Sequence, residues 1–202
     1  GLQEGDTIFF IAAPEKAACI YAGQIRNELG SRLDLLEKDA YRFCYINDFP
    51  MYEIDEETGK LGFTHNPFSM PQGGLEALNE KDPLDILAYQ YDIVCNGVEL
   101  SSGAVRNHDM EIMEKAFDIA GYDKETLKDK FGALYNAFQF GAPPHAGMAP
   151  GVDRMIMLLR NEENIREIIA FPMSGTAQDL MCGAPNEITE QQLREVHIKV
   201  RD

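Results

Sequence analysis

The pattern of apolar and polar residues predicts a strand and a helix at the start of the chain. The apolar run from Thr7 to Ala13 has the length of a short buried strand. Pro14 suits the first position of a helix, and the apolar residues after it recur three or four positions apart until Gly30. These first residues indicate structure rather than chemistry.

Two further strands are expected on either side of a polar turn. Residues 42–49 alternate between apolar and polar side chains, and the turn at residues 55–59 leads to a second strand that ends near His65. We expect these two strands to pair antiparallel. Residues 66–83 have little periodicity and contain several prolines and a Gly-Gly pair, which predicts a loop of the length that commonly carries function.

The stretch YDIVCNGVELSSGAVR at residues 91–106 combines strand-forming valines with charged residues. The Asn-Gly pair in its middle is a hairpin signal, so the stretch should cross a sheet and return. Asp92, Glu99 and Arg106 follow one another at intervals of seven, so simple alternation would not place all three on one face. Only the turn could bring them together, and a buried charge needs a partner or a ligand.

Helical spacing dominates the second half of the chain. Two helices with one apolar face each should follow Arg106, and a third should follow the Pro-Gly pair at 150–151. The residues expected to face inward in this third helix are Val152, Met155, Ile156 and Leu159. Thr189 with a glutamine three residues later is a capping-box signature that opens a last helix. The order of strands and then helices predicts an α+β fold, with an antiparallel sheet flanked by helices.

Composition and charge limit the classes of protein that fit. A chain of 202 residues with 45% hydrophobic and 26% charged residues should fold as one domain, or as one domain plus part of another. The formal net charge of -16 argues against bulk electrostatic attraction to nucleic acid or to an anionic membrane. Any contact with nucleic acid should therefore depend on a local basic site or on a module absent from this chain.

The cysteines and the apolar runs indicate the cellular compartment of the protein. The cysteines are scattered without a CxxC pair, and each lies among apolar neighbours, so we interpret them as buried thiols of a reducing cytoplasm. They are Cys19, Cys44, Cys95 and Cys182. The sequence has neither a run long enough to span a membrane nor a signal-peptide pattern, which predicts a cytoplasmic protein. The start at Gly1, close to a strand-like run, suggests a piece of a longer protein.

The candidates for chemistry are charged residues near glycines, because the common nucleotide, hydrolase and zinc signatures are absent from the sequence. Asp92 and Glu99 could bind Mg²⁺ on a nucleotide, or could pair with a nearby arginine. Arg106 could clamp a carboxylate or phosphate, or could be the partner of one of those acids. Arg154 could bind phosphate, or could pair with a glutamate that follows its helix. His65 could contact a substrate or be structural.

Several blocks of the sequence resemble the bacterial-type aspartyl-tRNA synthetases, which are class II enzymes. GVDRMIML at residues 151–158 is similar to the third signature motif of class II synthetases. GAPPHAGMAPG at 141–151 and the stretch at 91–106 are similar to blocks typical of the aspartyl enzymes, and DFPMYE at 48–53 and THNPFSMP at 64–71 also match. The resemblance extends over nearly the whole chain, in the order that the family has.

This resemblance implies an ATP-dependent ligase that forms aspartyl-adenylate and passes the aspartyl group to the 3′ end of its tRNA. The substrates would be L-aspartate, ATP and tRNA, with Mg²⁺ at the nucleotide. Glu99 would contact ATP and Mg²⁺, with Asp92 as a second metal-binding acid. His65 and Arg106 would bind aspartate, the latter through the side-chain carboxylate. The ATP-binding segment would be Gly151, Val152, Asp153 and Arg154, and Glu99 and Arg154 would be the catalytic residues.

The sequence also departs from the family pattern. Some relatives have a second histidine after His65, where this chain has Asn66. The anticodon-binding barrel and the first two signature motifs, which come earlier in the family, are not present. We therefore expect residues 1–38 to be the end of the family's inserted domain and the return into the catalytic domain, and residues 39–202 to be the C-terminal part of the catalytic domain.

These missing parts lead to expectations about the parent protein. It should be a homodimer that binds tRNA mainly through the missing N-terminal module, and the isolated chain should be inactive. A second hypothesis is a non-catalytic paralogue that binds ATP or aspartate as a sensor or partner protein. Retention of Glu99, Arg106 and Arg154 together favours the enzyme. The sequence leaves open whether the parent charges only its own tRNA or also the asparagine tRNA.

Overall fold

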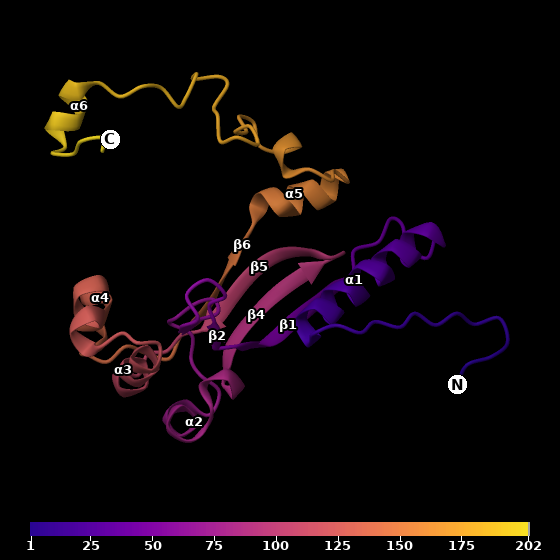
Figure 1. Ribbon diagram of the computed structural model, residues 1–202, viewed down its shortest axis with the longest axis horizontal. Coiled ribbons are helices and arrows are strands. Elements are labelled where there is room, and N and C mark those ends of the chain that lie inside the picture. The colour runs from indigo at the N-terminus through magenta and orange to yellow at the C-terminus, as the bar shows by residue number, and fades with distance from the viewer. Residues whose placement is uncertain (202) are drawn as a thin grey trace. The chain divides into compact units, whose positions relative to one another are not determined.

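The structure is a computed structural model that describes residues 1–201 (Figure 1). In chain order its elements are α1 (Glu15–Arg32), β1 (Phe43–Pro50), β2 (Tyr52–Ile54), β3 (Leu61–Phe63), α2 (Gly74–Glu80), η1 (Pro83–Asp85), β4 (Leu87–Cys95), β5 (Val98–Val105), α3 (Met110–Ile119), α4 (Lys124–Phe138), β6 (Ala146–Pro150), α5 (Val152–Arg160), η2 (Ile165–Glu167) and α6 (Glu190–Glu195). The paired strands are antiparallel, so the predicted α+β class is confirmed.

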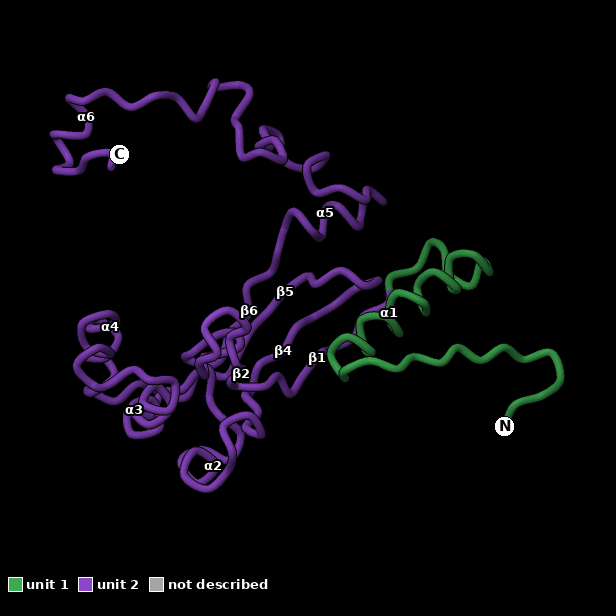
Figure 2. The backbone as a smooth tube through the Cα atoms, viewed as in Figure 1, with its two compact units in different colours: residues 1–41 green, residues 42–202 purple. Residues whose placement is uncertain are grey.

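The chain divides into two compact units, residues 1–41 and the residues from Arg42 onward (Figure 2). The first unit consists of an extended segment and helix α1, which buries none of its residues. The second unit contains all the strands among residues 1–201. The assignment of residues 1–38 to an inserted domain stays a prediction.

The first unit corrects one prediction and confirms another. The predicted strand from Thr7 to Ala13 is wrong: the run is extended and largely exposed. A strand needs hydrogen bonds to a neighbour, and none of residues 1–201 forms a ladder with this run. Helix α1 begins directly after Pro14 as predicted, and it continues past Gly30 to Arg32.

The described residues form one sheet with the strand order β1-β4-β5-β6 and a second sheet from β2 and β3. This arrangement corrects the predicted pairing, because the strand at 42–49 pairs with β4 while β2 and β3 form the hairpin around the polar turn. The register of β1 against β4 shifts between Asn47 and Phe49, where Asp48 has a φ of 59°. That irregularity lies within β1, whose ladder with β4 resumes at Phe49 and Pro50, and the alternation of the sequence does not reveal it.

The hairpin of β4 and β5 agrees with the prediction. Asn96 and Gly97 have φ angles of 50° and 82°, which the tight hairpin turn requires at both central positions. Strand β6 was not predicted, because Ala-Gly-Met-Ala-Pro is a poor strand sequence, yet it pairs with β5 along its length. Strand β6 then runs directly into α5 (Figure 1).

The core of the second unit lies where the β2–β3 hairpin and the start of β4 meet helices α2, α3 and α4. Two clusters of buried residues form it, and both pack against Phe63. The buried members are Met51, Tyr52, Leu78, Ile86, Ala88, Ala116, Met113, Phe117, Leu127 and Tyr135. The predicted apolar faces of α3 and α4 are therefore confirmed. Each large side chain buried in this way stabilises the fold by about 1.5–3 kcal/mol.

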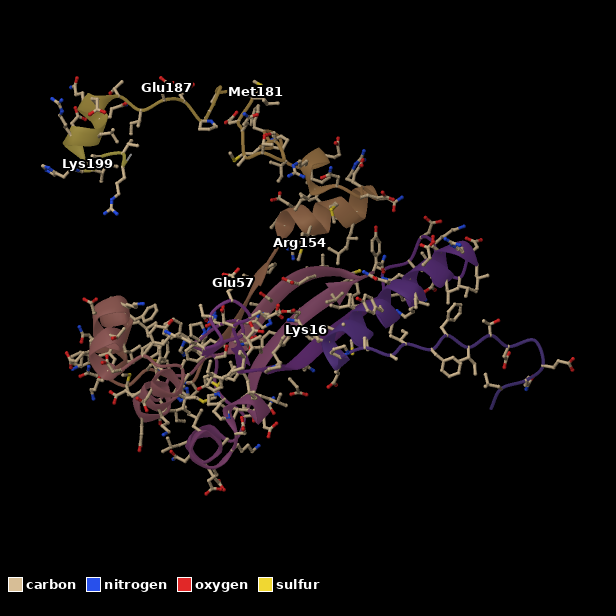
Figure 3. All side chains as sticks on the ribbon, in the orientation of Figure 1. Lys16, Glu57, Arg154, Met181, Glu187 and Lys199 are labelled. Atoms are coloured by element: carbon tan, nitrogen blue, oxygen red, sulfur yellow. The ribbon has the colours of Figure 1, made fainter. Side chains whose placement is uncertain are left out.

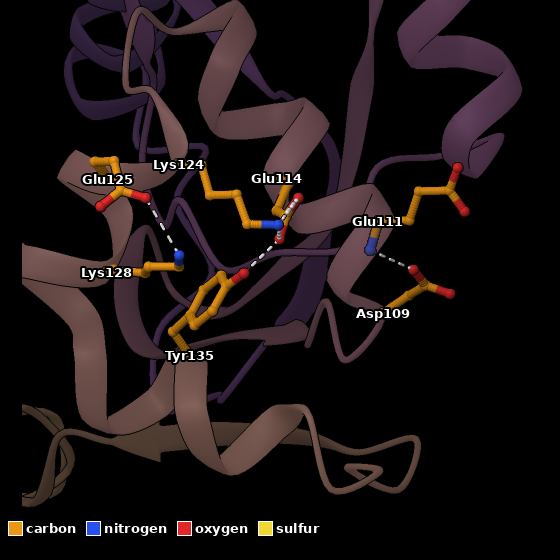
Figure 4. A network of polar contacts seen from close by, with 7 residues as sticks. All are labelled: Asp109, Glu111, Glu114, Lys124, Glu125, Lys128 and Tyr135. Atoms are coloured by element: carbon orange, nitrogen blue, oxygen red, sulfur yellow. Dashed lines mark hydrogen bonds and ion pairs between the residues drawn. The ribbon is translucent and has the colours of Figure 1, made fainter.

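A polar network ties α3 to α4 beside this core (Figure 4). Glu114 accepts hydrogen bonds from Tyr135 Oη at 2.6 Å and from Lys124 Nζ at 3.0 Å. Burial raises the pKa of Glu114, but the hydrogen bonds from Lys124 and Tyr135 outweigh burial, so the pKa lies below its usual value. Asp109 caps α3 through the backbone N–H of Glu111 at 2.9 Å.

Residues 68–72, which we call the bridging segment, lie between the open ends of β4 and β5. Four backbone hydrogen bonds hold the segment there, from Met70 to Val105, Tyr89 to Met70, Gln72 to Leu87 and Asn107 to Phe68. The predicted loop at 66–83 is thus fixed against both strands of the hairpin, although it lacks regular secondary structure at these residues.

Two predictions about burial are wrong. In α5 the expected inward face is exposed, since Val152 and Leu159 are 63% and 68% accessible and no element among residues 1–201 covers them. The cysteines are all free thiols, but only Cys95 is buried. Those at positions 19, 44 and 182 are exposed, because α1 and β1 have open faces and the third lies in a tail loop.

Two other predictions agree with the described residues. Helix α6 begins at the predicted capping box, in which Thr189 and Gln192 exchange hydrogen bonds. No helix within residues 1–201 is both long enough and apolar enough to cross a membrane.

Candidate active site

The hairpin of β4 and β5 brings together the acids that lie seven residues apart in the sequence. Between two paired positions β5 has one residue more than β4, and Leu100 is this extra residue. Glu99 pairs with Val94 beside the hairpin turn, and Val94 is two residues from Asp92, so alternation along β4 places Glu99 on the same face as Asp92 and its cross-strand partner Ser102. As expected from the sequence, the turn brings the two acids together, which alternation along a single strand would not do.

A cavity of about 290 Å³ opens on this face of the sheet. Its lining consists of Phe49, His65, Asn66, Gln90, Asp92, Glu99, Ser102 and Gly103. The structure thus brings together three predicted site residues, His65, Asp92 and Glu99, from a loop and two strands. Sequence reasoning missed Gln90 and Ser102 as site residues. Gln90 could have been found from its spacing of two residues from Asp92, whereas Ser102 required the pairing register.

The electrostatics of the cavity favour a cation between the two acids. Burial raises the pKa of Asp92, the charge of Glu99 raises it further, and His65 lowers it by less. The two carboxylates therefore repel each other, and a cation would relieve that repulsion. Within residues 1–201 no group of three or more His, Cys, Asp and Glu side chains is arranged for a metal ion. Two hard carboxylates fit Mg²⁺, which commonly takes its other ligands from water and substrate phosphates.

Arg154 lies at the start of α5 (Figure 3) and contacts Glu99 twice. Its Nη1 donates to the backbone oxygen of Glu99 at 2.8 Å and lies 3.2 Å from Oε1. The alternative that Arg154 pairs with a glutamate after its helix is therefore wrong. The two side chains are 45% and 46% exposed, which leaves other guanidinium donors accessible to a ligand.

The bulge also fixes the start of α5. The backbone N–H of Gly151 donates to the oxygen of Leu100 at 2.7 Å. The first intrahelical bond of α5 runs from Met155 to Gly151, so the N–H groups of Val152 and Asp153 have no partner within the helix. A helix start of this kind attracts anions.

Arg106 lies further along the same face but outside the lining of the cavity. Its backbone bridges to Ser69 and donates to the oxygen of His145 at 2.9 Å. The side chain is partly buried, and residues 1–201 provide no hydrogen bond or ion pair to the guanidinium. The alternative that Arg106 pairs with Asp92 or Glu99 is therefore wrong. A partly buried guanidinium without an acid favours an anionic ligand.

Comparison with known proteins adds the following similarities. The family model of tRNA synthetases class II (D, K and N) matches residues 13–175. An aspartate-tRNA(Asp/Asn) ligase from Zymomonas mobilis is 60% identical over 99% of this chain and 34% of its own length. An aspartate-tRNA ligase from Streptomyces coelicolor is 61% identical over 99% of this chain and 34% of its own length.

Among solved structures, an aspartyl-tRNA synthetase from Entamoeba histolytica is similar in fold. Its TM-score is 0.51 at 24% identity, over 87% of this chain and 29% of that chain. The chain spans about a third of the length of the curated relatives that it matches.

Proposed function

Because the chain belongs to the family of class II tRNA synthetases (D, K and N), we propose that it forms part of an ATP-dependent aspartate-tRNA ligase. The whole protein would form aspartyl-adenylate and then transfer the aspartyl group to the 3′ end of its tRNA. Identity of about 60% to relatives named aspartate-tRNA ligase supports this choice within the family. The observation that carries the proposal is the position of Glu99, which lies on one face with Asp92 and is bonded to Arg154.

Adenylation joins the α-carboxylate of aspartate to the α-phosphorus of ATP and releases pyrophosphate. The reaction needs no covalent enzyme nucleophile, so the protein contributes positioning and neutralisation of phosphate charge. Arg154, oriented by Glu99, would direct its free donors to the phosphates, and residues 151–153 would present the N–H groups of the first helical turn. Mg²⁺ held by Asp92 and Glu99 would supply further neutralisation of the phosphates.

The amino acid would bind through Arg106 and His65. The guanidinium fork of Arg106 would hold the side-chain carboxylate of aspartate, and the absence of another acid partner among the described residues supports this role. An asparagine amide in the same position would leave the guanidinium charge unpaired, and this discriminates strongly against asparagine in a dry site. His65, which lines the same cavity as Asp92 and Glu99, would contact the amino acid from its loop.

We extend the proposal to the location, the oligomeric state and the tRNA binding of the whole protein. It would act in the cytoplasm as a homodimer and would bind tRNA mainly through a module outside this chain. The net charge of -16 supports the last point, because a strongly acidic chain has little bulk attraction for a polyanion.

The test is aspartate-dependent exchange between ATP and pyrophosphate, in the complete protein encoded by the reading frame that contains this chain. Arg106→Ala should raise the KM for aspartate by about 10- to 100-fold, because hydrogen bonds to a charged group are lost. Arg160→Ala, at the other end of α5 from Arg154, is the matched control. It should leave the KM for aspartate and the KM for ATP unchanged. An Arg106→Ala enzyme that keeps its normal preference for aspartate over asparagine would contradict the assignment.

The competing hypothesis is a paralogue that binds ATP or aspartate without catalysis. It predicts calorimetric binding of either ligand by the complete protein and no exchange activity. We expect the 202-residue chain by itself to show no exchange, since it spans about a third of the relatives' length. Measurable exchange by this chain alone would overturn that expectation.

A further inference from the structure

Gln90 is a buried amide in the lining of the cavity. It is 7% exposed, and it lies two residues from Asp92 on the same face of β4. A buried amide needs hydrogen-bond partners, and Gln90 Nε2 donates to the backbone oxygen of Asn66 at 3.3 Å. The amide therefore joins the strand that carries Asp92 to the loop that carries His65.

Asn66 is the point at which this loop is fixed. Its backbone oxygen also accepts from the N–H of Ser69 at 3.2 Å, and its Oδ1 accepts from the N–H of Phe68 at 2.9 Å. These two bonds close a tight turn between Asn66 and the bridging segment. The bridging segment is held by backbone hydrogen bonds to both strands, so the turn is fixed at the end that joins this segment.

The other end of the turn is His65, and its own contacts are few. Its ring is exposed and meets the ring of Phe49 edge-on, with 5.1 Å between centroids. Across residues 1–201 the imidazole makes no hydrogen bond, and the nearest backbone anchor before it is the bond from Thr64 N to Met51 O at 3.1 Å. The place of the imidazole at the cavity therefore depends on the backbone of Asn66.

We propose that Gln90 is a positioning residue, which holds His65 at the cavity by donating to the backbone oxygen of Asn66. The proposal rests on the proposed function, in which His65 contacts the aspartate substrate. A glutamine suits this position better than glutamate or methionine, which are similar to it in shape. A glutamate would repel the oxygen of Asn66 and add a third negative charge beside Asp92, whereas a methionine fills the space without a donor.

The kinetic test uses pyrophosphate exchange by the complete protein. Gln90→Met should raise the KM for aspartate roughly tenfold, the effect of one lost hydrogen bond, and should leave the KM for ATP unchanged. In the His65→Ala background, Gln90→Met should have little further effect, because the residue that it positions is gone. Equal effects in both backgrounds, or a parallel rise in both KM values, would overturn the proposal.

A matched control exists in the bridging segment. Gln72 donates to Asp48 Oδ1 at 2.6 Å, and it does not line the cavity. Gln72→Met removes an amide of the same kind near the same loop. It should leave the KM for aspartate unchanged, and a rise equal to that of Gln90→Met would overturn the specific role of Gln90.

A second readout separates this proposal from the proposed function. In Gln90→Met the backbone N–H groups of Phe68 and Ser69 should exchange with solvent several-fold faster, whereas in Gln72→Met they should not. If the complete protein lacks aspartate-dependent exchange, the proposed function fails while hydrogen exchange still tests the positioning. Unchanged exchange at Ser69 would overturn the proposal. Gln90→Asn, an amide one methylene shorter, replaces Gln90→Met with the same expectations if the latter does not fold.

Discussion

Replacing Gly103 by alanine should force β5 and β6 apart. A Cβ at this position would lie 2.3 Å from the oxygen of Gly147, 2.7 Å from Cε2 of Tyr91 and 3.0 Å from Cα of Met148. Two of these three atoms belong to the backbone of β6. The Tyr91 ring cannot swing away freely, since its hydroxyl donates to the same oxygen of Gly147 at 2.9 Å.

The size of the effect follows from these contacts. Carbon atoms prefer separations near 3.5–4.0 Å, so β6 would have to move by on the order of 1 Å. Overpacking of this kind costs about 1–3 kcal/mol, and loss of the Tyr91 hydrogen bond adds about 1 kcal/mol. Because β6 continues directly into α5, the same movement would carry Arg154 away from Glu99.

Urea unfolding followed by far-ultraviolet circular dichroism measures this loss. With a slope of about 2 kcal/mol per molar urea, a loss of about 3 kcal/mol lowers the midpoint by about 1.5 M. The control is Gly147→Ala in the adjacent strand, where an added Cβ meets no atom within 4 Å. This control should change the free energy of unfolding by less than about 0.5 kcal/mol. If both variants unfold at the same urea concentration, the inferred collision between β5 and β6 is refuted.

Three further predictions concern ionisation and capping. Glu114→Gln should lower the free energy of unfolding at neutral pH by about 1–2 kcal/mol, because the charged acceptor that ties α3 to α4 is lost. Since the folded pKa of Glu114 is lowered, its stabilisation is present above the unfolded value of 4.5 and disappears as the pH falls through the folded pKa. A difference in melting temperature between the two proteins that does not narrow as the pH falls below 4.5 would contradict this. Asp92→Asn should raise the melting temperature at neutral pH, since burial and a neighbouring acid raise the pKa of Asp92 and make its charged form costly. That gain should vanish below the unfolded pKa of about 3.8, and a pH-independent gain would speak against an electrostatic cause. Thr189→Ala should destabilise α6 by about 1 kcal/mol, seen as faster amide exchange at Leu193, and unchanged exchange would show that the capping box contributes nothing.

The hairpin at the centre of the site was predictable, but its bulge was not. Local signals such as the Asn-Gly turn and the capping box at Thr189 depend on a few neighbouring residues, and these predictions are confirmed. The extra residue at Leu100 depends on how β5 pairs with its neighbours, which no local pattern records. The sequence therefore indicated the acids of the site and the turn that brings them together, but not the bulge whose backbone holds the start of α5.

Predictions of burial failed for a different reason. Apolar spacing shows which face of a segment is suited to burial, but not whether another part of the chain covers that face. The exposed side chains of Val152 and Leu159 in α5, and the unpaired run from Thr7 to Ala13, are of this kind. Cavity residues such as Phe49 and Asn66 were missed because they come from segments distant from β4 in the sequence.

The bulge at Leu100 determines which part of the site a change in the length of β5 would affect. Glu99 faces Asp92 because the hairpin turn pairs it with Val94, and Leu100 comes after this pair and plays no part in that arrangement. Deleting Leu100 would give a regular ladder that keeps Glu99, Ser102 and Asp92 on one face, but it would remove the backbone oxygen that accepts from the N–H of Gly151 at 2.7 Å. The loss of one residue here should therefore disturb the start of α5 and Arg154 while leaving the two acids on their shared face.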